Sequence, residues 1–87
     1  MNKIWQIEIS ATAEKQLKKL NKAQQKRIIP AILALAQNPR PDGCKKLRGY
    51  ADVYRIRVGL CRVIYSVEDK RLVVIVLKLG HRRDIYR

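Results

Sequence analysis

The chain has 87 residues, and its 20 Lys and Arg against 7 Asp and Glu give a formal net charge of +13 at pH 7. Hydrophobic residues make up 47% of it, which excludes a disordered basic tail. The length fits one small domain over residues 1–87 and leaves no room for a dinucleotide-binding unit or a barrel enzyme. With one His and seven scattered carboxylates, a carboxylate metal cage or a paired-carboxylate hydrolase is not expected.

The sequence indicates neither a targeting segment nor a functional cysteine motif. The N-terminus has no signal-peptide apolar run, and the longest strongly apolar stretch, 72–77, is too short to cross a bilayer. The spacing of Cys44 and Cys61 fits neither a zinc knuckle nor a redox motif. We therefore expect reduced cysteines that pack in a cytoplasmic protein, with no membrane partner, no metal and no small-molecule cofactor.

The first twenty residues predict a strand and a helix. Residues 3–9 alternate with period two, as in a half-buried strand, and the apolar face holds Trp5, Ile7 and Ile9. Ser10 is a good N-cap for an amphipathic helix over 11–20. Its buried stripe is formed by Ala13, Leu17 and Leu20.

A second helix is predicted over 22–37, with Ile28, Ile32 and Leu35 on its buried side. Pro30 lies inside it, so either the helix kinks there or Pro30 opens a new helical segment. Asn-Pro at 38–39 ends the helix and 40–43 is turn chemistry.

The rest of the chain predicts β-strands joined by turns at 59–60 and 68–70. A short edge segment and three strands are expected at 45–49, 53–58, 61–67 and 72–79. The near-continuous apolar run of 72–79 predicts a strand that is covered on both faces and central in the sheet, ended by Gly80 and followed by a basic tail, 81–87. The β-α-α-β-β-β order predicts an α+β fold, with two N-terminal helices on one face of a small, mainly antiparallel, four-stranded sheet.

The strand faces separate the arginines from the core. Tyr54, Ile56 and Val58 suit the face under the helices, so Arg55 and Arg57 share the opposite face. A tight turn would place Arg62 across from that row, and Arg82 and Arg83 emerge beside it.

Like charges on adjacent strands repel one another, and this cluster has only Asp52 as a nearby acid in the sequence. Guanidinium groups recognise phosphate through two parallel hydrogen bonds, which a lysine cannot provide. We therefore interpret the five arginines as a phosphate site.

Two further groups of basic residues are less specific. The helix cations could form a solvated surface or a second RNA-docking stripe: Lys15, Lys18, Lys19, Lys22, Lys26 and Arg27. The loop cations Lys45, Lys46 and Arg48 could extend either region.

Among the aromatic residues, Tyr54 and Tyr65 are expected to pack within the sheet, and Tyr50, in a loop, is given no role. Tyr86 could stack on a nucleobase or could pin the tail onto the sheet.

Four motifs follow one another along the chain: KLRG (46–49), YRIRVG (54–59), RVIY (62–65) and GHRRDIY (80–86). In this order they resemble the RelE family of toxins of type II toxin–antitoxin systems, in the RelE/ParE superfamily. The resemblance covers nearly the whole chain. It implies a RelE-like fold and a ribosome-dependent mRNA endonuclease, an mRNA interferase that cleaves codons in the ribosomal A site.

The resemblance also implies roles for single residues. The family's basic pair corresponds to Arg55 and Arg57, where some members have lysines, and a further arginine corresponds to Arg62. A tail arginine and a tyrosine correspond to Arg82 or Arg83 and to Tyr86.

Cleavage through the ribose 2′-OH requires stabilisation of an anionic transition state, which arginines can provide without a metal. Proton transfer is harder to assign, because arginine is a poor acid and base near neutral pH. His81 is the only conventional candidate, although a lone His at a strand end is more often structural.

The partners implied are mRNA, the ribosome and a cognate antitoxin, expected to be acidic and to fold over the basic face. A gyrase inhibitor of the same fold, similar to ParE, and a non-catalytic RNA-binding or ribosome-binding module are the alternatives.

Overall fold

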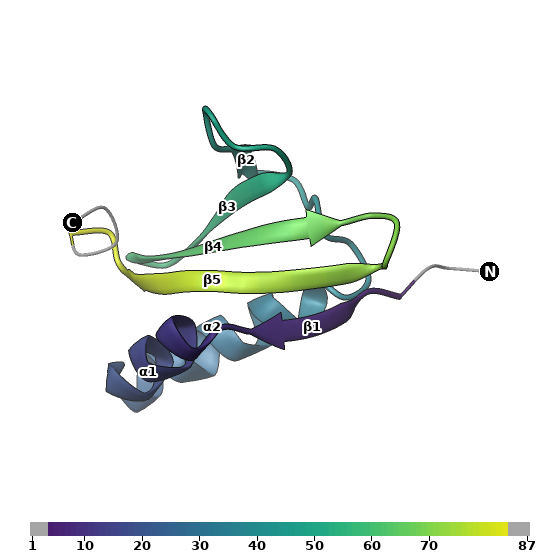
Figure 1. Ribbon diagram of the computed structural model, residues 1–87. Helices are drawn as coiled ribbons and strands as arrows, with labels where there is room; N and C mark the ends of the chain where they lie inside the picture. Colours follow the sequence, from purple (N-terminus) through teal and green to yellow (C-terminus); the bar gives the residue numbers. More distant parts are fainter. Residues whose placement is uncertain (1–3, 84–87) are drawn as a thin grey trace.

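The computed structural model describes residues 4–83, which form two helices and a five-stranded sheet (Figure 1). The elements are β1 (Gln6–Ile9), α1 (Ala11–Lys19), α2 (Lys22–Ala34), β2 (Lys45–Lys46), β3 (Val53–Val58), β4 (Cys61–Glu68) and β5 (Val73–His81). The strand order is β1-β5-β4-β3-β2; β1 runs parallel to β5, and the other neighbours are antiparallel.

The α+β class and the mainly antiparallel sheet are confirmed, but the sheet has five strands and not four. The additional strand is β2, whose two residues pair with Arg55 and Tyr54 of β3 at the edge of the sheet. The fifth strand is therefore the short edge segment expected within 45–49. Two residues of pairing give little sequence signal, since the period-two pattern needs more positions to show.

The helices cover one face of the sheet, and the core lies between them. Ala13, Ile28, Ile32 and Leu35 are buried there as predicted, with Leu17 and Leu20 packed against them. The sheet contributes the residues of the face turned toward the helices: Ile56, Cys61, Val63, Tyr65, Val67, Val74, Val76 and Leu79. None of the helices within residues 4–83 is long and apolar enough to cross a membrane.

Beyond the end of β1, the N-cap and helix α1 supply hydrogen-bond partners for the backbone of β5. The Ser10 hydroxyl caps the helix by accepting the Ala13 N–H at 3.0 Å, and it also donates to the Leu77 carbonyl at 2.8 Å. Gln16 Oε1 accepts the Leu79 N–H at 2.8 Å. Backbone groups that would be orphaned at an open edge are thus satisfied by α1, which fixes the end of β5.

Two local expectations need correction. Helix α2 continues through Pro30, so the alternative in which Pro30 opens a new segment is wrong. Proline has no N–H, so Pro30 cannot donate a hydrogen bond to the Lys26 carbonyl. Both residues are exposed, so water can solvate that carbonyl. Gly80 does not end the last strand, because β5 runs to His81 and Gly80 pairs with Arg62.

The side chains of β5 and β1 are more exposed than the sequence predicted. β5 is an interior strand, as predicted, but Leu77 on it is 36% exposed, so the face away from the helices is only partly covered. In the first strand, Trp5 and Ile7 pack against the core, whereas Ile9 is 41% exposed because β1 is an edge strand.

Candidate functional site

The predicted arginine row lies on the sheet face away from the helices. In the β3–β4 ladder Arg57 is directly opposite Arg62, and Arg55 is opposite Ile64. Directly opposite residues in an antiparallel pair place their Cβ atoms about 5 Å apart on the same face. The sheet register therefore brings two guanidinium side chains together, as the sequence predicted.

Arg82 joins this pair at the β3–β4 turn. A small cavity of about 70 Å³ is lined by Arg57, Gly59, Leu60, Cys61, Arg62 and Arg82. The Arg82 N–H donates to the Leu60 carbonyl at 3.0 Å, which ties the end of β5 to the turn. Gly59 has φ +61°, a value that an L-residue seldom adopts and that the first position of a two-residue II′ turn requires. We call Arg57, Arg62 and Arg82 the arginine cluster.

The other candidate site residues near the C-terminus, Arg83, His81 and Tyr86, are not part of the arginine cluster as described. The Arg83 N–H donates to His81 Nδ1 at 3.2 Å, and Arg83 does not line the cavity. His81 pairs with Cys61, so its strand position belongs to the helix-facing side and not to the side of Arg57 and Arg62. The two alternatives for Tyr86 concern a position outside the described residues.

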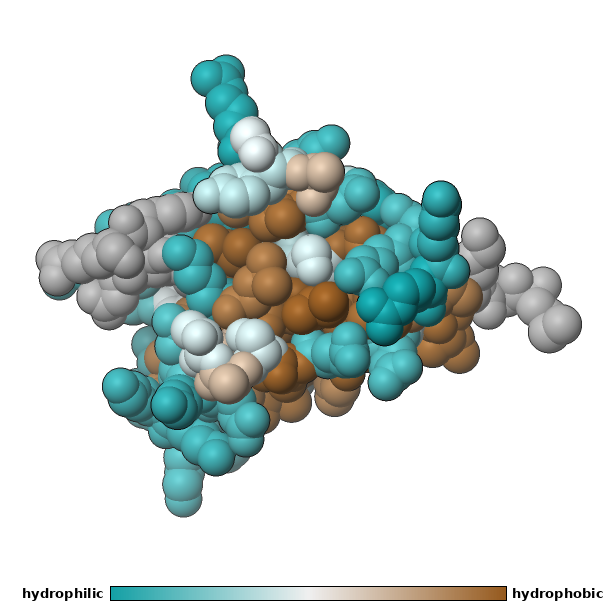
Figure 2. Space-filling model, in the orientation of Figure 1, coloured by the Kyte–Doolittle hydropathy of each residue, from teal (hydrophilic) through white to brown (hydrophobic). Residues whose placement is uncertain are grey.

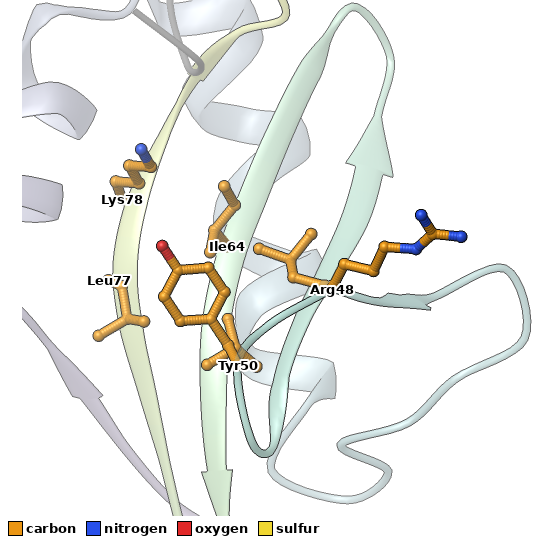
Figure 3. Close-up of a pocket in the computed structure, with 7 residues that line it drawn as sticks. Arg48, Tyr50, Ile64, Leu77 and Lys78 are labelled. Carbon is orange, nitrogen blue, oxygen red and sulfur yellow. The ribbon is translucent and has the colours of Figure 1, made fainter.

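The candidate RNA-binding residues lie at two separate places. Lys45 is opposite Arg55, so it extends the arginine face toward the sheet edge, while Lys46 belongs to the other face. Arg48 extends away from the sheet in Figure 3. Lys18, Lys19 and Lys22 are exposed on the helices, and Lys18 forms an ion pair with Glu14 at 3.4 Å.

An apolar groove on the arginine face was not anticipated. It has a volume of about 400 Å³ and is lined by Leu47, Arg48, Tyr50, Val53, Ile64, Leu77 and Lys78. Figure 2 shows an apolar centre on this face between hydrophilic margins. In Figure 3 the Tyr50 ring lies over the sheet between Ile64 and Leu77, so this residue, given no role above, lines the groove. The signal was present in the apolar Val53 and Ile64, which share the face of the arginine row.

A second unanticipated feature surrounds Arg40 at the other end of β3. Its Nη1 and Nη2 donate to Asp69 Oδ1 and Oδ2 at 3.0 and 2.8 Å, and its Nε donates to the Tyr54 hydroxyl at 2.9 Å. Asp52, expected near the arginine cluster, lies 3.9 Å from Arg40 Nη2 instead. The hydrogen bonds with Asp69 and Tyr54 raise the pKa of Arg40 above its ordinary value.

The buried titratable side chains follow from packing. Tyr65 stacks with Tyr54 at a ring-centroid distance of 6.0 Å, as predicted for strand packing, and donates its hydroxyl to the Pro39 carbonyl at 2.7 Å. Burial raises the pKa of Tyr65 above its ordinary value. Both cysteines are free, and burial raises the pKa of the Cys61 thiol, while the nearby Arg27 charge opposes that shift.

Comparisons with known proteins agree with this architecture. Residues 7–86 match the family described as the ParE toxin of the type II toxin–antitoxin system parDE. Toxin RelG of Mycobacterium tuberculosis is 30% identical over 86 residues, which cover 93% of this chain and 94% of RelG. The mRNA interferase toxin RelE of Escherichia coli K12 is 28% identical over 87% of this chain and 81% of that protein. An archaeal RelE–RelB complex from Pyrococcus horikoshii has a RelE-like chain with TM-score 0.81 and 35% identity, covering 93% of this chain and 98% of the other.

A two-helix cover on a five-stranded sheet, with an arginine-lined turn, is thus the fold of a small type II toxin. The chain belongs to the RelE/ParE superfamily of toxins of type II toxin–antitoxin systems. The resemblance inferred from the four sequence motifs is confirmed.

Proposed function

We propose that the chain is a ribosome-dependent mRNA interferase that cleaves codons in the A site. The observation that carries the proposal is the arginine cluster, in which Arg57 is directly opposite Arg62 and Arg82 lines the same small cavity. Guanidinium groups that lie side by side on one face can bind one phosphate through paired hydrogen bonds. The relative from Escherichia coli is named an mRNA interferase, which agrees with a phosphodiester substrate.

The chemistry that fits this cluster is attack by the ribose 2′-OH on the adjacent phosphate. Arg62 and Arg57 bind the scissile phosphate and stabilise the phosphorane-like transition state, because preorganised positive charge acts where negative charge develops. Arg82 stabilises the departing 5′ oxygen as the P–O5′ bond breaks. The proton lost from the 2′-OH passes to water and the 5′ oxygen takes a proton from water, so the products are a 2′,3′-cyclic phosphate and a 5′-OH. This route needs no metal, since the nucleophile is internal to the substrate and the cluster supplies the compensating charge. Arg55 and Lys45, paired across β2 and β3, guide the neighbouring backbone.

The positioning of the base is assigned to Tyr86, which would stack on the nucleotide beside the cut and hold it for in-line attack. We assign no proton transfer to His81, because its strand position is on the helix-facing side and its Nδ1 accepts the Arg83 N–H. We reserve Arg83 for contacts with the substrate backbone.

A cognate antitoxin is the second partner that we propose. A RelE relative from Pyrococcus horikoshii forms a complex with RelB. For this chain, a net charge of +13 favours an acidic partner, and the exposed Tyr50 and Leu77 beside the arginine row offer it apolar contacts. Together these features favour a partner that covers the arginine face, in the cytoplasm, where ribosomes are.

The test is a toeprint on ribosomes programmed with a defined mRNA, comparing wild type with Arg62→Ala. We expect an A-site cut with wild type and a loss of at least about 100-fold in rate with the variant, on the scale of one preorganised charge in a transition state. Arg71→Ala is the matched control, because Arg71 pairs with Glu68 at the opposite end of the hairpin. Equal cleavage by all three proteins would contradict the assignment of the site.

The alternative favoured by a specific observation is inhibition of DNA gyrase, because the matching family is described as ParE toxin. A supercoiling assay separates the two functions. Inhibition of gyrase without any A-site cut would replace the interferase proposal. Salt-sensitive RNA binding with neither activity would indicate a non-catalytic RNA-binding module.

A further inference from the structure

Arg27 of α2 reaches the same turn as the arginine cluster, from the side of the helices. A Cβ built on Gly59 would lie 3.0 Å from Arg27 Nη1 and 3.2 Å from Arg27 Cζ. The guanidinium group therefore lies directly against the backbone of the turn that joins Arg57 to Arg62. The helix pattern placed Arg27 with the outward-facing lysines, so this contact is a finding of the structure.

The turn has features that allow the approach. Gly59 lacks a side chain, and any side chain there would meet the Arg27 guanidinium as well as the strain of φ +61°. Leu60, the other turn residue, is 62% exposed, so its side chain does not pack into the core. Arg27 itself is exposed, and its charge influences the Cys61 thiol, which lines the cluster cavity. Both faces of the hairpin tip thus carry a guanidinium group.

The charge of Arg27 is not balanced by an ion pair within residues 4–83, whereas Lys18 pairs with Glu14 and Arg71 pairs with Glu68. Arg27 therefore adds a positive charge at a turn that already has Arg57, Arg62 and Arg82 around it. Clustered charge of one sign attracts a polyanion and becomes favourable when the polyanion binds.

We infer that Arg27 is a substrate-binding residue that holds an RNA phosphate next to the scissile one, so that the RNA backbone bends over the Gly59–Leu60 turn between the two faces of the hairpin. The inference rests on the proposed function for the identity of the substrate. It assigns Arg27 to binding and not to the cleavage step, because Arg27 does not line the cavity of the arginine cluster.

The experiment measures binding of the full-length protein to a short single-stranded RNA with 2′-O-methyl riboses, which cannot be cleaved through the 2′-OH. Fluorescence anisotropy over a range of salt concentrations gives the slope of log K against log salt. We expect Arg27→Gln to reduce the magnitude of this slope by about 0.7, the value of one phosphate contact on a single strand. Lys26→Gln is the matched control, because it removes one exposed charge from the adjacent position of the same helix and should leave the slope near that of wild type.

Thermal unfolding and ribosomal cleavage complete the test. A purely structural Arg27 predicts a lower Tm for Arg27→Gln with the same salt slope as Lys26→Gln, and that result would overturn the inference. On programmed ribosomes we expect Arg27→Gln to raise KM about five-fold, the scale of one exposed charge contact, with kcat unchanged. If wild type gives no A-site cut, the interferase proposal fails, while the difference in salt slope between the two variants still decides whether Arg27 binds RNA.

Discussion

The two ends of the β3–β4 hairpin hold arginines in opposite settings. At the open end, where β3 begins, Arg40 donates three hydrogen bonds to Asp69 and Tyr54 and lies 5.0 Å from the Tyr54 ring centroid. At the turn end, Arg57 and Arg62 are directly opposite each other, and Arg82 lines the cavity with them. The same side chain thus appears once as the centre of a charge-compensated network and once within a cluster of like charges.

This difference links charge to stability in one region and, in our proposal, to binding in the other. A guanidinium group that meets a carboxylate through two hydrogen bonds fixes loop 38–44 and the β4–β5 turn to the sheet. Guanidinium groups placed opposite each other concentrate positive charge on one face, which favours a bound anion. A net charge of +13 cannot distinguish these uses, whereas the sheet register can.

The largest expected effect separates the two tail arginines at the turn end. Arg82→Ala should lower the rate of A-site cleavage by about 100-fold, because Arg82 lines the cavity with Arg57 and Arg62 and is proposed to stabilise the leaving group. Arg83→Ala, its neighbour with the same charge, should lower the rate by less than about ten-fold, since Arg83 does not line that cavity. Single-turnover cleavage on programmed ribosomes measures both. A larger loss for Arg83→Ala would assign the role of the tail arginine to Arg83 in place of Arg82.

At the opposite end the expected effect is on stability. Arg40→Ala removes the paired contact with Asp69 and the contact with the Tyr54 ring, so unfolding should become easier by about 1–2 kcal/mol, an amount already reduced for solvent screening. For a domain of this size the Tm should fall by roughly 5–15 °C.

Arg71→Ala serves as the control for Arg40→Ala, because it removes one exposed ion pair with Glu68 and should cost less than about 0.5 kcal/mol. Cleavage by Arg40→Ala should match wild type well below its Tm. Equal Tm values for the two variants would show that the network around Arg40 does not hold the loop.

Most of the fold could be predicted because both helices and the longer strands follow local patterns. Ser10 caps α1 as its residue type suggests, and the alternation in 53–58 gives both the strand and its two faces. The five-stranded sheet was missed because β2 has two residues and its pairing with Arg55 and Tyr54 is set by tertiary contacts. The continuation of α2 through Pro30 depends on solvent exposure, which the sequence pattern alone does not report.

The arginine pair was predictable for a similar reason, since a two-residue turn at Gly59 fixes the register that sets Arg57 opposite Arg62. The contact of Arg27 with Gly59 and the ion pair of Arg40 with Asp69 join segments that are far apart in the sequence. Their partners follow from the way α2 and loop 38–44 pack on the sheet. Residue spacing predicts which side chains meet across a tight turn, but it does not predict contacts between segments that are distant in the sequence.

The last expected effect is the pH dependence that Tyr65, in the aromatic pair beneath Arg40, adds to stability at high pH. The folded chain raises the pKa of Tyr65 by burial, while the unfolded chain titrates it near its ordinary value of about 10. Above about pH 10 the unfolded state therefore binds fewer protons than the folded state, so stability falls as the pH rises. Below that pH the contribution of Tyr65 is fully present.

Urea unfolding at about pH 9 and about pH 11 measures this contribution. Tyr65→Phe should be less stable than wild type by about 1–2 kcal/mol at the lower pH, because the Pro39 carbonyl loses its donor in a buried site. It should lose less stability than wild type between the two pH values, since the titrating hydroxyl is gone. Tyr50→Phe is the control, because Tyr50 is 64% exposed and should keep the pH dependence of wild type. If Tyr65→Phe and Tyr50→Phe lose the same stability between the two pH values, the ionisation of Tyr65 does not contribute to the pH dependence of unfolding, and its role is limited to packing and to the hydrogen bond with Pro39.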